Sequence, residues 1–180
     1  MKYTYTVGPK NFLNFQLYHI SQTDEFKSKL KRQPLFIMLT NLAIAAYFAA
    51  DKKYVFSIIF VAIGLLWYFL YPARIRRHYE SRFENDINTK FDKHFNNEAH
   101  LEITDDFLRT SDEGGSSEKK YSDIVKIVHL PEETFVIFKN KQTFILPKEK
   151  IENYSSMVDE LNAKAKRFTI RVEDLPNWKW

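Results

Sequence analysis

The chain has 180 residues, a formal net charge of +4 and no cysteine. The lack of cysteine excludes a disulfide framework, a thiolate metal site and a cysteine nucleophile. The four glycines, at positions 8, 64, 114 and 115, leave no phosphate-binding loop of the dinucleotide or Walker type. A hydrophobic content of 44% excludes a disordered chain. The length predicts one domain, or one small domain with an additional part.

The first 33 residues read as a strand followed by helix. Residues 2–7 alternate polar and apolar side chains, which is typical of a strand, and Gly8-Pro9 ends it. Residues 10–20 carry a broad apolar face at helical spacing, and the polar stretch 21–33 continues as helix.

Two apolar runs, residues 34–50 and 54–71, follow. The only charges between Arg32 and Arg74 are the three at 51–53, which separate the runs. As helices they reach roughly 25 and 27 Å, the short end of what crosses a bilayer. Neither run has the polar stripe of a surface helix, and aromatic residues gather near the ends. We therefore predict a transmembrane helical hairpin over 34–73; the alternative is a hairpin buried in a soluble protein.

Basic residues set the expected orientation of this hairpin. Eight Lys and Arg flank the outer ends of the two runs, against Lys52 and Lys53 in the turn. By the positive-inside rule both termini lie in the cytoplasm, and the chain is a multi-pass protein of the cell (inner) membrane. The flanking residues are Lys27, Lys29, Lys31, Arg32, Arg74, Arg76, Arg77 and Arg82.

Within the runs, Asn41 and Gly64 are the candidates for a helix–helix contact. An amide in lipid seeks a hydrogen-bond partner, either inside the hairpin or on another helix, including that of a second copy of the chain. The runs contain no ionisable side chain, so a transport pathway is not predicted.

Residues 74–98 read as an amphipathic stalk helix. Apolar residues recur every four positions, which places them on one slowly winding stripe. We expect the stripe to pack on residues 10–31 and further out on the sheet; the alternative is a helix lying on the membrane surface. The stripe comprises Ile75, Tyr79, Phe83, Ile87, Phe91 and Phe95.

Residues 99–166 change to short runs rich in β-branched and aromatic side chains, separated by turn residues. They predict one antiparallel meander closed by a helix at 153–166, capped by Asn153 or Ser155. This arrangement resembles a small pleckstrin-homology-like (PH-like) barrel, to which residues 2–7 add a strand. Residues 167–180 form a tail whose Trp178-Lys179-Trp180 end lies at the bilayer interface, packs on the sheet or is unattached. The fold class is thus an α+β membrane protein.

The chain also resembles the YcxB-like protein family. The resemblance rests on FLNFQLYHI at 12–20, the two apolar runs, PARIRRHYE at 72–80, and the segment from LEITDDF to ILPKEKI, which ends at residue 151. It covers about 160 residues; Ile151 stands where the family pattern has Phe, and 167–180 is an addition. The resemblance implies a bacterial two-span membrane protein with a YcxB-like domain at the C-terminal end. It assigns no catalytic residue.

No pattern in the sequence points to catalysis. The histidines, at 19, 78, 94, 100 and 129, lack the spacing of metal ligands. The acidic pairs, including Glu132-Glu133, fall at expected turns, where they read as solvated charges. We expect no enzyme activity, no metal and no cofactor.

The expected partners are the lipid bilayer and a protein, peptide or lipid headgroup bound by the cytoplasmic domain, for example by strand addition at a sheet edge. A homo-oligomer is compatible with the spans. The β region carries 10 basic and 13 acidic residues, so nucleic-acid binding is not expected. The alternative function is an accessory or regulatory subunit of a larger membrane complex, such as a transporter or an immunity system.

Overall fold

The computed structural model describes residues 2–90, 95, 97–112 and 115–180. The chain divides into two compact units, one made of residues 1–15 with 86–180 and the other of residues 16–85. We call them the α/β unit and the helical unit. Parts of our sequence-based expectations lie outside the described residues: positions 91–94 and 96 of the expected stalk helix, which include Phe91 and His94, and positions 113–114 of a turn.

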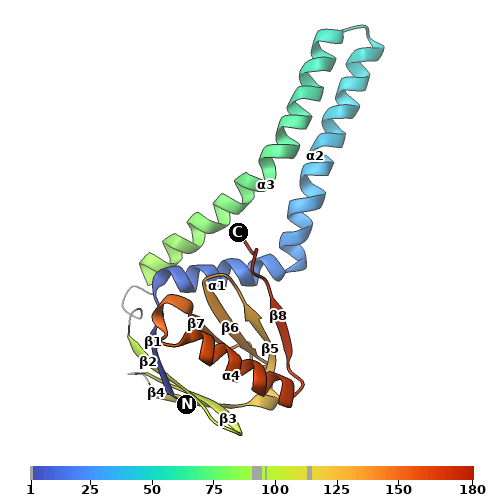
Figure 1. Cartoon of the computed structure of the whole chain (residues 1–180). Coiled ribbons are helices and arrows are strands. Elements are labelled where there is room, and N and C mark those ends of the chain that lie inside the picture. Colours follow the sequence, from blue (N-terminus) through green and yellow to red (C-terminus); the bar gives the residue numbers. More distant parts are fainter. Residues whose placement is uncertain (1, 91–94, 96, 113–114) are drawn as a thin grey trace. The chain divides into compact units, whose positions relative to one another are not determined.

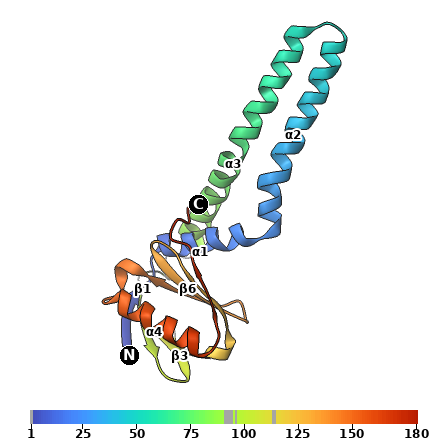
Figure 2. The same ribbon diagram turned by 45° about the vertical axis from the view of Figure 1, so that its right-hand side comes forward.

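The helical unit is dominated by a hairpin of two long helices, α2 (Asp24–Ala50) and α3 (Tyr54–Lys90). The helix α1 (Pro9–Gln22) is divided between the two units after residue 15, and the last residues of α3, from Asp86, belong to the α/β unit. Figures 1 and 2 show α2 and α3 running side by side to a tight turn. The turn is closed by Lys52, whose φ of 57° is left-handed, and by an ion pair of 2.7 Å between Lys53 and Asp51. By length and composition alone, both helices are long and apolar enough to cross a membrane.

Both helices extend further than the apolar runs. Pro34, the first residue of the first apolar run, lies inside α2. The helix begins ten residues earlier, where the Thr23 hydroxyl accepts a hydrogen bond of 3.3 Å from the Phe26 amide. Likewise α3 passes through Pro72, so the second run and the amphipathic stretch are one helix.

After Pro72, the apolar stripe with its four-residue spacing lies on the side of α3 that packs against protein. Tyr79 meets the Phe26 ring of α2 edge-on at 5.3 Å and its hydroxyl lies 3.2 Å from Lys29 Nζ. Within the stripe, Phe83 is half-buried and Ile87 is only 4% exposed. These contacts favour packing of the stripe on protein over a helix that lies on lipid.

The α/β unit contains two four-stranded sheets (Figure 1). The first has the order β1-β2-β3-β4 and is antiparallel throughout; the predicted N-terminal strand joins it at one edge. The second has the order β7-β6-β5-β8, with antiparallel β5–β6 and β6–β7 pairs and a parallel β5–β8 pair. The strands are β1 (Lys2–Thr6), β2 (Glu98–Ile103), β3 (Phe107–Asp112), β4 (Gly115–Lys120), β5 (Ile124–His129), β6 (Glu133–Phe138), β7 (Thr143–Pro147) and β8 (Arg171–Asp174).

Our prediction of a single antiparallel meander was therefore wrong, because the strands form two sheets and β4 does not pair with β5. A 3₁₀ turn, η2 (Tyr121–Asp123), separates β4 from β5, and the fully buried Tyr121 ring anchors it in the core. The chain thereby changes sheets, so β5 pairs with β6 and β8 instead of β4. A second short turn, η3 (Lys148–Lys150), follows β7.

The helix α4 (Tyr154–Arg167) supplies the apolar stripe that completes the core. Its Met157, Leu161 and Ala165 are at most 1% exposed and belong to one cluster with apolar residues from both sheets. The expected side-chain cap is absent, because Asn153 precedes the helix in a left-handed conformation (φ 55°) and makes no capping hydrogen bond.

The C-terminal segment, which we had expected to be a tail, contributes the strand β8. Val172 lies opposite Ile127 in the parallel ladder, and Lys126 and Glu173 form an ion pair of 2.9 Å. We had left three positions open for this segment: at the bilayer interface, on the sheet or unattached. In the structure its strand β8 is attached to the second sheet.

Candidate ligand cavity

The strand β6 is covered on both faces. Five of its six residues are buried, so its sequence ETFVIF is not the alternating pattern of a half-exposed strand. Val136 and Phe138 point into the core between the sheets. On the other face Phe135, which is fully buried, meets the Phe15 ring of α1 edge-on at 5.6 Å. The first turns of α1 therefore cover the outer face of the second sheet.

Glu133, the first residue of β6, lies on this covered face and is only 1% exposed. Its Oε2 accepts a hydrogen bond of 3.3 Å from Asn11 Nδ2, and the Asn14 side chain also bonds to the carboxylate. Its Oε1 is buried and has no hydrogen-bond partner among the described residues. The neighbouring Glu132, by contrast, is half exposed and forms an ion pair of 2.8 Å with Lys10.

Burial raises the pKa of the Glu133 carboxyl to about 7. The hydrogen bonds from Asn14 and Asn11 oppose this shift, the Glu132 charge adds to it, and the Lys10 charge opposes it. The carboxyl therefore changes its charge near neutral pH, which an exposed glutamate does not do.

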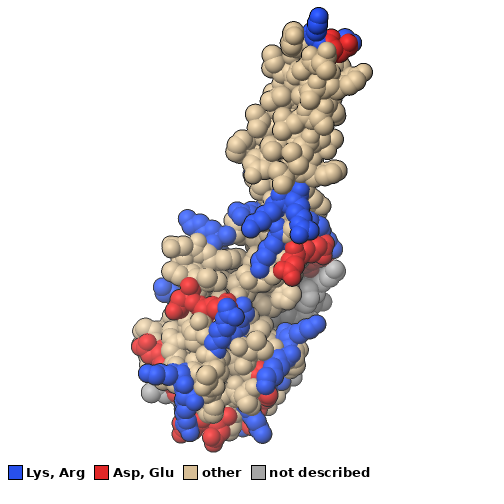
Figure 3. Space-filling view, turned by 90° about the vertical axis from the view of Figure 1, so that its right-hand side faces the viewer, with Lys and Arg blue, Asp and Glu red and all other residues tan. Residues whose placement is uncertain are grey.

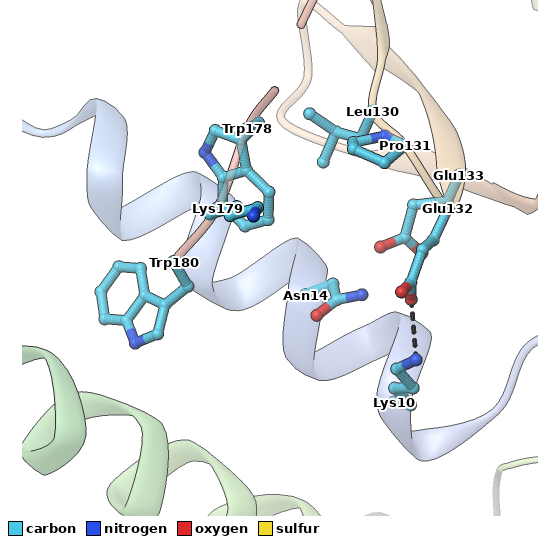
Figure 4. A pocket seen from close by; sticks show the side chains of 9 residues that line it. All are labelled: Lys10, Asn14, Leu130, Pro131, Glu132, Glu133, Trp178, Lys179 and Trp180. Atoms are coloured by element: carbon cyan, nitrogen blue, oxygen red, sulfur yellow. Dashed lines mark ion pairs between the residues drawn. The ribbon is translucent and has the colours of Figure 1, made fainter. Parts of the chain in front are cut away.

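Glu133 lines a cavity of about 290 Å³ (Figure 4). Three segments distant in sequence form its walls: the first turns of α1, the turn between β5 and β6, and the C-terminal segment after β8. Figure 4 shows indole rings and carboxylates contributed by different segments around the same space. The lining residues are Lys10, Asn14, Leu130, Pro131, Glu132, Glu133, Trp178, Lys179 and Trp180.

Backbone hydrogen bonds position the segment that leads to the two tryptophans. The Leu175 amide donates to the His129 carbonyl at 2.9 Å, which extends the β5–β8 pairing by one residue. The Trp178 amide then donates to the Leu175 carbonyl at 3.1 Å and closes a turn. The position of the indoles thus follows from the attachment of β8 to the sheet.

A cluster of four hydrogen-bonded polar side chains lies on the opposite face of β6. Thr134 Oγ1 is 2.7 Å from His129 Nδ1 and 2.6 Å from the Tyr154 hydroxyl, while His129 Nε2 is 3.0 Å from Asn162 Oδ1. Burial raises the pKa of the Tyr154 hydroxyl. None of these four residues lines the cavity, and together they satisfy one another's hydrogen bonds, as buried polar groups in a core do.

Asn41 and Gly64, our candidates for a helix–helix contact, are adjacent in the hairpin. A Cβ placed on Gly64 would lie 3.0 Å from the Asn41 Cβ, so the helices approach closely at the glycine. Asn41 Nδ2 donates to the Ile37 carbonyl at 2.9 Å in its own helix. This close approach is made within one chain.

The candidate membrane-flanking basic residues lie at the wide end of the hairpin. Lys27, Lys31 and Arg32 on α2 and Arg74, Arg76 and Arg77 on α3 are exposed. Lys29 is the exception: it is half-buried and bonds to Glu25 at 2.6 Å and to Tyr79. Arg74 also lies over the Trp67 ring, 6.0 Å from its centroid.

Sequence reasoning missed the cavity altogether. It assigned Glu132-Glu133 to a solvated turn, whereas only Glu132 is in the turn. The available signal was the run TFVIF, whose near-continuous apolarity indicates a strand buried on both faces, with Glu133 at its start. Among the described residues no group of three acidic or histidine side chains could hold a metal ion.

Comparison with known proteins finds a similarity in one part of the chain. Residues 103–161, which run from the end of β2 into α4, match the family model described as YcxB-like protein. No curated protein and no solved structure shows significant similarity to the chain. The similarity to the YcxB-like protein family thus lies in the α/β unit, C-terminal to the two long helices.

Proposed function

We propose that the chain is an integral membrane protein in which the hairpin α2–α3 anchors a cytoplasmic, non-enzymatic binding domain of PH-like fold. The observation that carries the proposal is the exposure of the hairpin's apolar side chains. Among the described residues, all but three of the exposed large hydrophobic side chains lie between Leu35 and Leu70. Phe36 and Phe69, for example, are each 72% exposed.

Such a surface needs a covering that water does not provide. Soluble proteins rarely expose contiguous apolar patches beyond a few hundred Å². Figure 3 shows the hairpin as an uncharged shaft between a charged turn and a basic end. Lipid chains cover a surface of this kind, and the buried hairpin of a soluble protein would not leave it exposed.

The basic end supports the orientation. Anionic headgroups attract Lys and Arg beside a span, each by about 1 kcal/mol. Seven of the eight flanking basic side chains, all but Lys29, are exposed at the wide end of the hairpin, against Lys52 and Lys53 at the turn. We therefore propose that the wide end, and with it both termini, lies on the cytoplasmic side.

The binding role is supported by the α/β unit itself. Two sheets closed by a C-terminal helix are the arrangement we expect of a PH-like module, and the parallel strand β8 is an addition to it. The cavity beside Glu133 has the mixed apolar and polar walls of a ligand site.

Reporter fusions test the anchor and its orientation. A reporter active only in the cytoplasm should work when fused after residue 180, and one active only outside should work when inserted at residues 51–53. The chain should also remain in the membrane fraction after alkaline extraction. A C-terminal reporter active only on the outer side, or release of the chain by alkali, would contradict the proposal.

The second candidate, an accessory subunit of a larger membrane complex, uses the same surface, because helices of another protein can also cover exposed apolar side chains. The close approach at Gly64 is used inside the hairpin, and Asn41 bonds within α2, so neither points to a partner helix. A stable complex recovered with the isolated hairpin, residues 24–90, would favour this candidate over the first.

A further inference from the structure

The unpaired oxygen of Glu133 is the feature of the cavity that calls for a ligand. Oε1 is buried, it belongs to a residue only 1% exposed, and that residue lines the cavity. Leaving a buried carboxylate oxygen without a hydrogen bond is unfavourable, because the oxygen has lost its water without gaining a protein donor. This free-energy cost is removed when the carboxyl takes up a proton or when a hydrogen-bond donor enters the cavity.

The surroundings of Glu133 favour a donor that carries positive charge. Two cations line the cavity: Lys10 forms an ion pair of 2.8 Å with Glu132, and Lys179 forms no ion pair with Glu133 among the described residues. Asn11 and Asn14 contribute neutral amides only. Among the described residues the Glu133 carboxylate thus has hydrogen bonds but no ion-pair partner of its own.

The geometry selects the kind of cation. Asn11 and Asn14 already bond to the carboxylate and only Oε1 has no partner, which suits a single N–H···O contact better than the two parallel bonds of a guanidinium. A metal ion would require further ligands that the described residues around the cavity do not supply. The indole rings of Trp178 and Trp180 favour an organic cation, because aromatic faces attract positive charge.

We propose that this cavity binds the primary ammonium group of a small organic cation, with a ligand N–H donating to Glu133 Oε1 and the indoles of Trp178 and Trp180 against its carbon atoms. The inference rests on the binding role proposed above and names the ligand class. Free ethanolammonium and the ethanolamine headgroup of a phospholipid carry the same chemistry.

Titration of the full chain in a non-ionic detergent, in phosphate buffer at pH 8 without other amines, tests the proposal. The indole N–H signals of Trp178 and Trp180 report on the cavity, and that of Trp67 in α3 serves as internal reference. Ethanolammonium chloride should shift the first two signals in a saturable way. Choline chloride, which has the same charge but no N–H donor, should bind at least about tenfold more weakly, since a hydrogen bond to a charged group contributes roughly 1.5–3 kcal/mol.

Two variants separate the cavity from unspecific effects. Glu133→Gln should weaken ethanolammonium binding at least about tenfold, because the charge is lost. Glu118→Gln is the matched control: this exposed carboxylate pairs with Arg109 on the first sheet and does not line the cavity, so binding should be unchanged. Equal affinity for choline and ethanolammonium, or unchanged binding by Glu133→Gln, would overturn the inference.

Nanodiscs distinguish the two sources of the ligand. If the headgroup is the ligand, phosphatidylethanolamine discs shift the Trp178 and Trp180 signals and phosphatidylcholine discs do not; if a free amine is the ligand, only the soluble cation does so. No shift from either source overturns the inference. Membrane extraction and the reporter fusions are independent of this result, so a failure here is distinguishable from a failure of the proposed anchor.

Discussion

Replacing Phe135 by alanine should lower the free energy of unfolding of the α/β unit by about 3–5 kcal/mol. The ring is 0% exposed and contacts Phe15 edge-on at 5.6 Å, so its removal leaves a cavity between β6 and the first turns of α1. Thermal unfolding of the full chain in detergent, followed by near-ultraviolet circular dichroism, should show a melting temperature lowered by more than about 10 °C.

Val125→Ala is the control for this experiment. Val125 also lies in the second sheet but is 49% exposed, and substitutions at such sites stay within about 0.5 kcal/mol. Limited proteolysis should in addition show faster cleavage within residues 9–15 in Phe135→Ala alone. Similar melting temperatures for the two variants would mean that α1 does not cover this face of the sheet.

Glu133→Gln should stabilise the α/β unit at pH 8 by about 3 kcal/mol, because the pKa of this carboxyl rises from 4.5 to about 7 on folding and each unit is worth about 1.36 kcal/mol. Below pH 4.5 the carboxyl is protonated in both states and the variant has no advantage. Between pH 4.5 and 7 the unfolded chain releases the proton first, so the wild-type stability falls as the pH rises. Above pH 7 the difference is constant.

Unfolding of both proteins at pH 4, 6 and 8, in buffers without primary amines, measures this difference. The charged groups near Glu133 are Lys10 from α1, Glu132 from its own turn and Lys179 from the C-terminal segment; Tyr154 of α4, also nearby, stays neutral over this pH range. Glu132→Gln is the control: it removes the half-exposed pair with Lys10 and a charge that adds to the shift of the Glu133 pKa, but burial is the larger cause, so the fall in stability between pH 4.5 and 7 should remain, reduced in size. A wild-type stability that does not fall between pH 4.5 and 7 would refute the buried, unpaired carboxyl.

The amino-acid sequence determined the elements that local patterns encode. A gap in the charges predicted two long apolar helices, period-two alternation predicted most strands including β1, and three-to-four spacing predicted α4. These features need only neighbours in the chain, because apolar periodicity and turn residues act over a few positions. Even so, Pro34 and Pro72 did not end their helices: a proline removes one backbone hydrogen bond, and the rest of a long helix retains its own.

Tertiary structure alone decided the cavity and the burial of Glu133. The pairing of β8 with β5 joins residues more than 40 positions apart, and a parallel ladder has no turn between its strands that a sequence could reveal. That pairing carries Trp178 and Trp180 to the mouth of the β5–β6 turn, and α1 covers the other side. Whether the second carboxylate of an acidic pair is solvated or buried depends on which distant segment lies against it, and for Glu133 those segments are α1 and the residues after β8.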